Sequence, residues 1–115
     1  MIKRPVVVIV DDDARVLESL GELVESAGYG VRTFNGAAAF LDSGHSDIDC
    51  LISDICMPGM DGFGILEVVR QARPELPVFL ITARDDIADQ ERAAADREGL
   101  RTIVSKNETT TRETS

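Results

Sequence analysis

The stretch Val6–Val10 limits the possible folds of this chain more than any other feature, because it is short and apolar at every position. A strand with one solvent-facing side alternates apolar and polar residues, whereas a strand covered on both faces does not. Short apolar runs recur at 50–53, 78–81 and 102–104, and a more mixed run at 31–34 fits an edge strand. The pattern predicts five strands, four of them buried.

Helical patterns fill the intervals between these runs. Apolar residues at helical spacing follow the first run, where Asp13 is placed to cap a helix and Gly28 to end it in a left-handed conformation. Three further helices are expected: one that starts at Asn35, one from Asp61 to near Pro74, and one from Asp86 to Glu98. Alternation of strands and helices predicts an α/β fold with helices on both faces of a parallel sheet.

The length and charge of the chain limit its domain organisation, its binding partners and its location. A chain of 115 residues suits one domain, which we place at residues 1–106, followed by a polar tail at 107–115 that is expected to be disordered. The net charge of -9 repels nucleic acid phosphates and anionic membranes, so direct DNA binding is not expected. No apolar run approaches a membrane span and no signal-peptide core follows Met1, so we expect a cytoplasmic protein.

Polar residues stand at the predicted carboxyl ends of the strands. Asp11 and Asp12 follow the first strand, Asp54 and Thr82 end the third and fourth, and Lys106 follows the fifth. Ligands of open α/β sheets bind at this edge, so these side chains are expected to converge. Three clustered carboxylates repel one another unless a cation compensates, and Mg²⁺ prefers such oxygen ligands.

Together the five residues predict a site for phosphoryl transfer, since a lysine and a hydroxyl can bind phosphoryl oxygens. Each has a plainer interpretation on its own: Thr82 as a strand-end hydroxyl, Lys106 as a solvated cation, and the acidic excess as ordinary surface charge. The neighbouring Asp13 is better explained as a helix cap than as a ligand.

The motifs that carry these residues resemble the receiver domains of two-component response regulators, over residues 5–106. They are Val10-Asp11-Asp12-Asp13, Ser53-Asp54 through Asp61-Gly62, Ile81-Thr82-Ala83 and Ser105-Lys106. The segments 39–41 and 54–62 are most similar to receivers joined to a helix-turn-helix output domain. The resemblance implies a flavodoxin-like, doubly wound five-stranded sheet in the order 2-1-3-4-5.

For the site, the resemblance implies that Asp54 accepts a phosphoryl group and that Mg²⁺ is held by Asp11, Asp12, Asp54 and the backbone carbonyl of Cys56. Thr82 and Lys106 would bind the phosphoryl oxygens. The donor would be a histidine kinase, a phosphotransfer protein or a small acyl phosphate. Such a domain is a phosphoacceptor that assists its own phosphorylation and dephosphorylation, and it is not otherwise an enzyme. Phosphorylation would switch the conformation through Thr82 and the fourth helix.

Two departures from the family favour a different function. Ile103 stands where the family usually has a Tyr or Phe, and the polar residues after Lys106 lack the pattern of the family's fifth helix, so that this helix is expected to be missing. Unless the sequence is a truncated one, apolar surface left open in this way favours a homodimer or a domain swap through the face of the fourth helix and fifth strand. The alternative function is therefore a receiver-like docking or dimerisation module that does not depend on phosphorylation.

Overall fold

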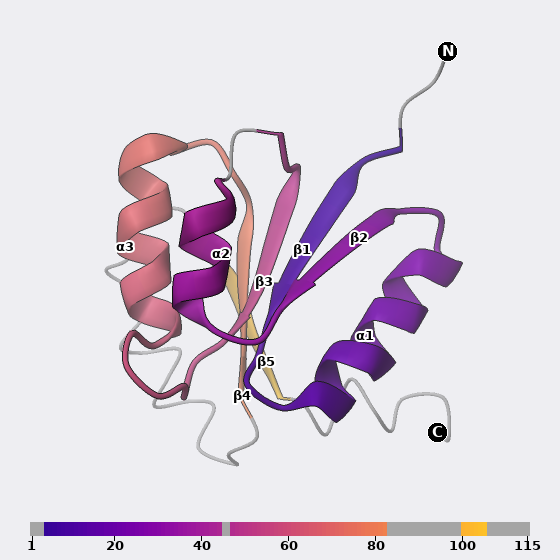
Figure 1. The fold of residues 1–115 in the computed structure, drawn as a ribbon. Coiled ribbons are helices and arrows are strands. Elements are labelled where there is room, and N and C mark those ends of the chain that lie inside the picture. The colour runs from indigo at the N-terminus through magenta and orange to yellow at the C-terminus, as the bar shows by residue number, and fades with distance from the viewer. Residues whose placement is uncertain (1–3, 45–46, 83–99, 106–115) are drawn as a thin grey trace.

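The protein is an open α/β sheet with helices on both faces, seen here in a computed structural model (Figure 1). The structure describes residues 4–44, 47–82 and 100–105, with backbone only at Thr82 and at 100–105. All strands are parallel, in the order β2-β1-β3-β4-β5, which is the predicted order. The strands are β1 (Val6–Val10), β2 (Gly30–Phe34), β3 (Cys50–Asp54), β4 (Val78–Thr82) and β5 (Leu100–Ser105).

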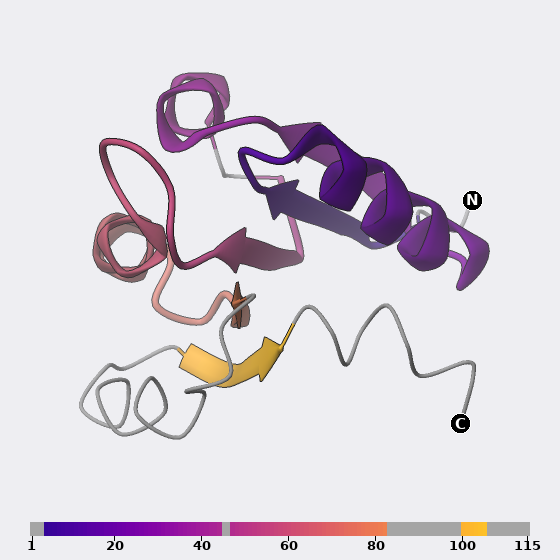
Figure 2. The same ribbon diagram turned by 90° about the horizontal axis from the view of Figure 1, so that it is seen from below.

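The described helices divide unequally between the two faces of the sheet. Helix α1 (Ala14–Ser26) lies on one face, and α2 (Ala37–Ser43) and α3 (Gly62–Ala72) lie on the other (Figures 1 and 2). The mixed run at 31–34 forms the edge strand β2, as predicted. The predicted helix at 86–98, the expected lack of a fifth helix and the polar tail all lie outside the described residues.

The caps predicted from the sequence are present. The Asp13 carboxylate accepts a hydrogen bond from the backbone N–H of Arg15 at 2.9 Å, and Gly28 has a φ of 104° just after α1 ends. Asp61 caps α3 in the same way, because its carboxylate accepts from the N–H of Gly64 at 2.9 Å. Helix α2 begins at Ala37, and its cap Gly36 makes no side-chain hydrogen bond.

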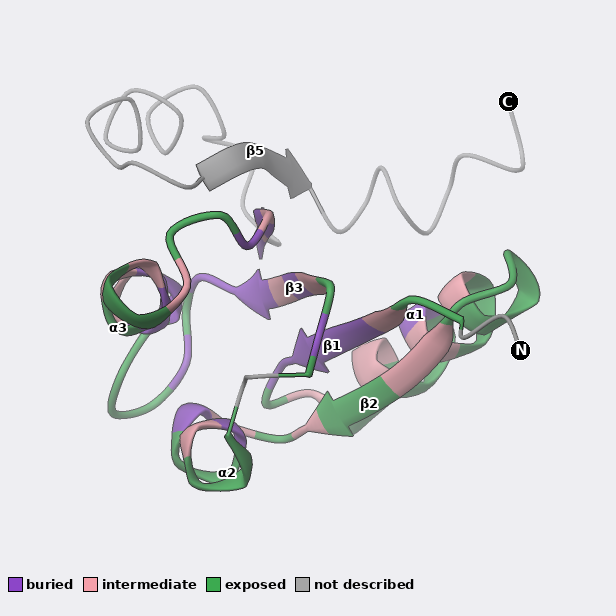
Figure 3. Ribbon diagram, turned by 90° about the horizontal axis from the view of Figure 1, so that it is seen from above, coloured by how far each residue is buried: buried purple, intermediate pink, exposed green. Residues whose placement is uncertain are grey.

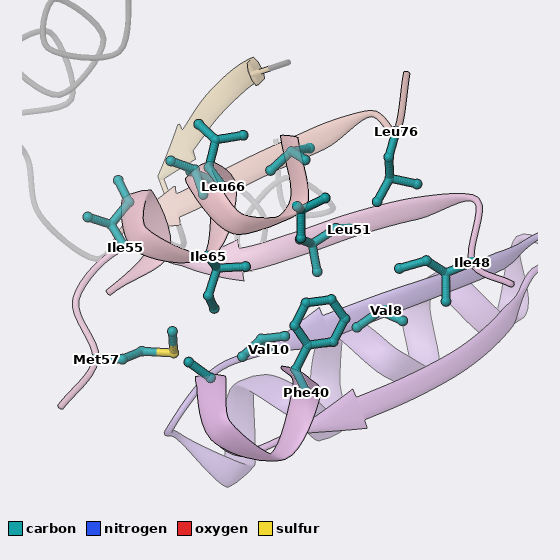
Figure 4. Packing of buried hydrophobic residues seen from close by; sticks show 14 residues of the cluster. Val8, Val10, Phe40, Ile48, Leu51, Ile55, Met57, Ile65, Leu66 and Leu76 are labelled. Atoms are coloured by element: carbon teal, nitrogen blue, oxygen red, sulfur yellow. The ribbon is translucent and has the colours of Figure 1, made fainter. Parts of the chain in front are cut away.

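The core is thick on the face covered by α2 and α3. Successive strand residues point to opposite faces, so an uninterrupted apolar strand such as β1 supplies both. The larger cluster packs strand residues against Phe40, Ile65 and Leu66, and it contains 14 buried residues (Figure 4). On the α1 face, the described residues form a cluster of only four buried hydrophobic residues: Val7, Ile9, Leu20 and Ile81. Figure 3 shows the buried strands between the helix layers.

Helix α3 starts directly against the backbone at the end of β3. Gly62, the first residue of α3, donates its N–H to the carbonyl oxygen of Ile55 at 2.9 Å. A Cβ at Gly62 would lie 2.5 Å from the carbonyl oxygen of Asp54 and 3.0 Å from the Cα of Ile55. Only glycine allows this approach, so Gly62 fixes the position of the chain just after Asp54. No helix in the described parts of the chain is long and apolar enough to cross a membrane.

Gly62→Ala should lower the free energy of unfolding by roughly 1–3 kcal/mol, because the added methyl group meets rigid backbone. Gly64→Ala is the matched control in the same helix, since its Cβ would meet the flexible side chain of Met60. We expect the control to stay within about 1 kcal/mol of the wild type, given that alanine is the better helix former. Urea unfolding followed by circular dichroism measures both. Equal stabilities of the two variants would contradict the close approach.

Candidate functional site

The parallel pairing of β1 with β3 brings two acidic segments to the same edge of the sheet. Val10 pairs with Ser53, and the next residues along the two strands are Asp11 and Asp54. Asp12 follows Asp11 in the loop that leads to α1. Residues more than 40 positions apart in the sequence therefore meet because their strands end side by side.

The three carboxylates form one cluster. Asp11, Asp12 and Asp54 each offer an oxygen, and these oxygens lie within 4.8 Å of one another. Asp11 is 0% exposed and Asp54 4% exposed, whereas Asp12 faces solvent. The cluster is thus built from two buried groups and one exposed group, and it opens to solvent on the side of Asp12.

Backbone hydrogen bonds hold the ends of both strands in place. The Asp11 carboxylate accepts from the N–H of Asp13 at 2.9 Å, which ties it to the start of α1. The N–H of Ile55 donates to the carbonyl oxygen of Ile81 at 2.9 Å, and the Ser53 hydroxyl donates to the Asp54 carbonyl at 3.0 Å. These hydrogen bonds fix the Asp11 carboxylate and the backbone on either side of Asp54.

The cluster suits a hard divalent cation. Two negative charges about 5 Å apart repel by roughly 3 kcal/mol at an effective dielectric constant of ~20. A cation between them would offset this repulsion. Oxygens on opposite sides of one Mg²⁺ lie about 4.2 Å apart, close to the observed limit of 4.8 Å. The three carboxylates are therefore close enough together to hold one ion.

The structure describes only some of the other residues that were predicted to form the site. Thr82 ends β4, and its neighbour Ile81 pairs with Asp54, so the backbone of Thr82 reaches the same edge of the sheet. Cys56 is an exposed residue in the loop after β3, two positions beyond Asp54. Lys106 lies outside the described residues.

Two residues that support the site were not singled out as part of it from the sequence. Gly62 packs on the Asp54 carbonyl, and Ser53 donates to the same oxygen. The role of Gly62 could have been inferred from the sequence, because a glycine stands there at the predicted start of a helix, close after a strand-end aspartate. Nothing in the sequence distinguishes the Ser53 hydroxyl from that of any other strand serine.

Comparison with known proteins agrees with this geometry. The response regulator receiver domain family matches residues 7–113. The transcriptional regulatory protein FixJ of Bradyrhizobium diazoefficiens is 40% identical over 81 residues, which are 69% of this chain and 39% of FixJ.

Two solved structures share the fold over most of the chain. The response regulator StyR is 34% identical with a TM-score of 0.78, over 96% of this chain and 57% of StyR. The BeF3-activated DrrB receiver domain is 25% identical with a TM-score of 0.79, over 90% of this chain and 86% of that domain.

The chain spans less than two thirds of the length of FixJ and of StyR, so the match concerns their receiver part. The family match covers most of the chain, and the sheet order is the one expected for the fold. The chain therefore belongs to the response regulator receiver domains of two-component signal transduction.

Proposed function

We propose that Asp54 accepts a phosphoryl group from the phosphohistidine of a histidine kinase or a phosphotransfer protein, in a Mg²⁺-dependent reaction. The observation that supports this best is the carboxylate cluster at the ends of β1 and β3, with oxygens within 4.8 Å of one another. Asp11, Asp12, Asp54 and the backbone carbonyl of Cys56 would hold the cation. Bound there, Mg²⁺ would supply charge neutralisation to the phosphoryl oxygens.

In this reaction a carboxylate oxygen of Asp54 attacks the phosphorus atom of the donor. The new P–O bond forms as the P–N bond to the donor imidazole breaks, and the imidazole takes up a proton as it leaves. A small acyl phosphate can serve as donor in the same way, with a carboxylate as leaving group. The hydroxyl of Thr82 and the ammonium of Lys106 would bind the phosphoryl oxygens, and no general base is required.

The phosphorylated form would then differ from the unmodified form in conformation. A hydroxyl of Thr82 drawn to the phosphoryl group gains a charged hydrogen bond worth roughly 1.5–3 kcal/mol. That matches the ~1–3 kcal/mol typical of allosteric coupling, so the segment after Thr82 is the proposed switch. Activation of the DrrB receiver by BeF3 supports such a mechanism, and the name of FixJ suggests that the output is transcriptional.

The proposed setting is the cytoplasm, where kinase and acceptor meet, with no direct contact to nucleic acid because of the net charge of -9. The protein would act as an acceptor that assists its own phosphorylation and dephosphorylation. The second candidate function is a docking or dimerisation module, using the face of the fourth helix and fifth strand. It is favoured by Ile103, because an aliphatic side chain cannot provide the aromatic signal usual in the family.

Incubation with acetyl phosphate and Mg²⁺ should give a phosphoryl adduct on the wild type and none on Asp54→Asn. The asparagine variant lacks the attacking carboxylate oxygen. Asp42→Asn removes an exposed aspartate on α2 and should be phosphorylated like the wild type. Intact-mass spectrometry reads all three. Failure of the wild type to form an adduct, or to bind beryllofluoride with Mg²⁺, would leave the docking module as the function.

Mg²⁺ at 100 times its dissociation constant should stabilise the folded protein by about 2.7 kcal/mol, because the cation binds only where the carboxylates are gathered. Asp12→Asn should lose most of this gain, and without Mg²⁺ it should be more stable than the wild type since one repelling charge is gone. Thermal unfolding by circular dichroism measures both effects. Asp42→Asn and KCl at matched ionic strength are the controls. A Mg²⁺ effect that survives in Asp12→Asn would place the cation elsewhere.

A further inference from the structure

Ser53 is a buried polar residue that the carboxylate cluster does not use. In the part of the chain that the structure describes, the buried polar residues are Asp11, Asp54 and Ser53, and Ser53 is 0% exposed. Val10 and Leu80 pair with Ser53 from the two neighbouring strands, and both belong to the apolar core under α2 and α3. A hydroxyl in such a layer is unfavourable unless it has a hydrogen-bond partner.

The partner of the Ser53 hydroxyl is the backbone of the proposed phosphoacceptor. The hydroxyl donates to the carbonyl oxygen of Asp54 at 3.0 Å. That carbonyl belongs to the peptide group between Asp54 and Ile55, whose N–H donates to the carbonyl oxygen of Ile81 at 2.9 Å. Gly62 also packs closely against the Asp54 carbonyl. The peptide group is therefore held at both ends, and its orientation is fixed.

The same hydrogen bonds continue to the backbone of Thr82. The Ile81 carbonyl belongs to the peptide group that joins Ile81 to Thr82, the last residue of β4. Two peptide groups in series thus connect the Ser53 hydroxyl with Thr82. Hydrogen bonds in such a chain polarise one another, so loss of the first weakens the second. Ser53 is placed to influence the ends of both β3 and β4.

A plainer reason for a serine at position 53 is its size. Helix α3 begins close to the end of β3, where a Cβ at Gly62 would meet the backbone of Asp54. Alanine would be equally small, however, and it would place no hydroxyl in the core. Size therefore does not explain the hydroxyl of Ser53, and substitution by alanine separates the two explanations.

We propose that Ser53 is a positioning residue for the phosphorylation of Asp54, an inference that rests on the proposed function. A rotation of the peptide group between Asp54 and Ile55 would turn the Asp54 carboxylate. It would also redirect the loop that carries the Cys56 carbonyl, a proposed ligand of Mg²⁺. The Ser53 hydroxyl opposes this rotation through its bond to the Asp54 carbonyl. Reactions that depend on positioning lose rate steeply when the reacting atoms are slightly misplaced.

Ser53→Ala should slow phosphorylation by acetyl phosphate and Mg²⁺ about 3- to 10-fold, the range that one neutral hydrogen bond contributes. Ser53→Thr keeps the hydroxyl and should restore most of the rate. Ser43→Ala is the matched control and should react like the wild type, because the Ser43 hydroxyl donates to the Phe40 carbonyl at 2.8 Å on α2. Time courses by intact-mass spectrometry measure all four proteins.

Nuclear magnetic resonance gives a second readout that needs no phosphorylation. In Ser53→Ala the amide proton of Ile55 should shift upfield, since its hydrogen bond to Ile81 weakens, and the amide proton of Thr82 should shift as well. Ile48→Val is the control for lost stability, because it shortens a side chain of the same core just before β3 begins. That control should leave both amide shifts and the rate of phosphorylation unchanged.

Phosphorylation of Ser53→Ala at the wild-type rate would overturn the proposal, and so would an Ile55 amide proton that does not shift. An equal loss of rate in Ile48→Val would do the same, because lost stability would then explain the effect. A wild type that forms no adduct would refute the proposed function itself, whereas the Ile55 shift would still decide whether Ser53 orients the peptide group after Asp54.

Discussion

The parallel pairing of β1 with β3 is the constraint on which the site depends. Because Val10 and Ser53 lie side by side, Asp11 and Asp54 must follow at the same edge of the sheet, and Asp12 joins them within 4.8 Å. Each repulsion of this kind is roughly 3 kcal/mol, similar to the ~1.5–3 kcal/mol gained by burying one large apolar side chain. The 14 buried residues under α2 and α3 can therefore hold such an arrangement together.

Unfavourable charge at one edge makes the fold responsive to what binds there. A cation that relieves the repulsion would stabilise the folded state, and in the proposed reaction it would also neutralise charge on the phosphoryl oxygens. The supporting contacts come from backbone: the N–H of Asp13 on the Asp11 carboxylate, and the close approach of Gly62 to the Asp54 carbonyl. Positioning of this kind suits phosphoryl transfer, in which charge neutralisation matters more than proton transfer.

The two faces of the sheet have different roles. Among the described residues, the α2 and α3 face supplies most of the buried apolar side chains and fixes the strands whose ends form the site. In the part of the chain that the structure describes, the α1 face has the smaller core, and a groove with no charged lining residue lies beside Leu23 and Tyr29. The acidic flank of α1, at Glu18, Glu22 and Glu25, lies along a separate depression.

The sequence by itself determined the strands and the helices capped by Asp13 and Asp61, since these follow from local patterns. It also determined the sheet edge at which Asp11, Asp12 and Asp54 would meet, because all parallel strands have their carboxyl ends at the same edge. The sheet order was inferred only through the family resemblance. Tertiary structure alone decided that Gly62 packs on the Asp54 carbonyl and that a groove opens between α1 and β4. Both depend on how elements distant in sequence approach each other, and local residue preferences carry no information about those distances.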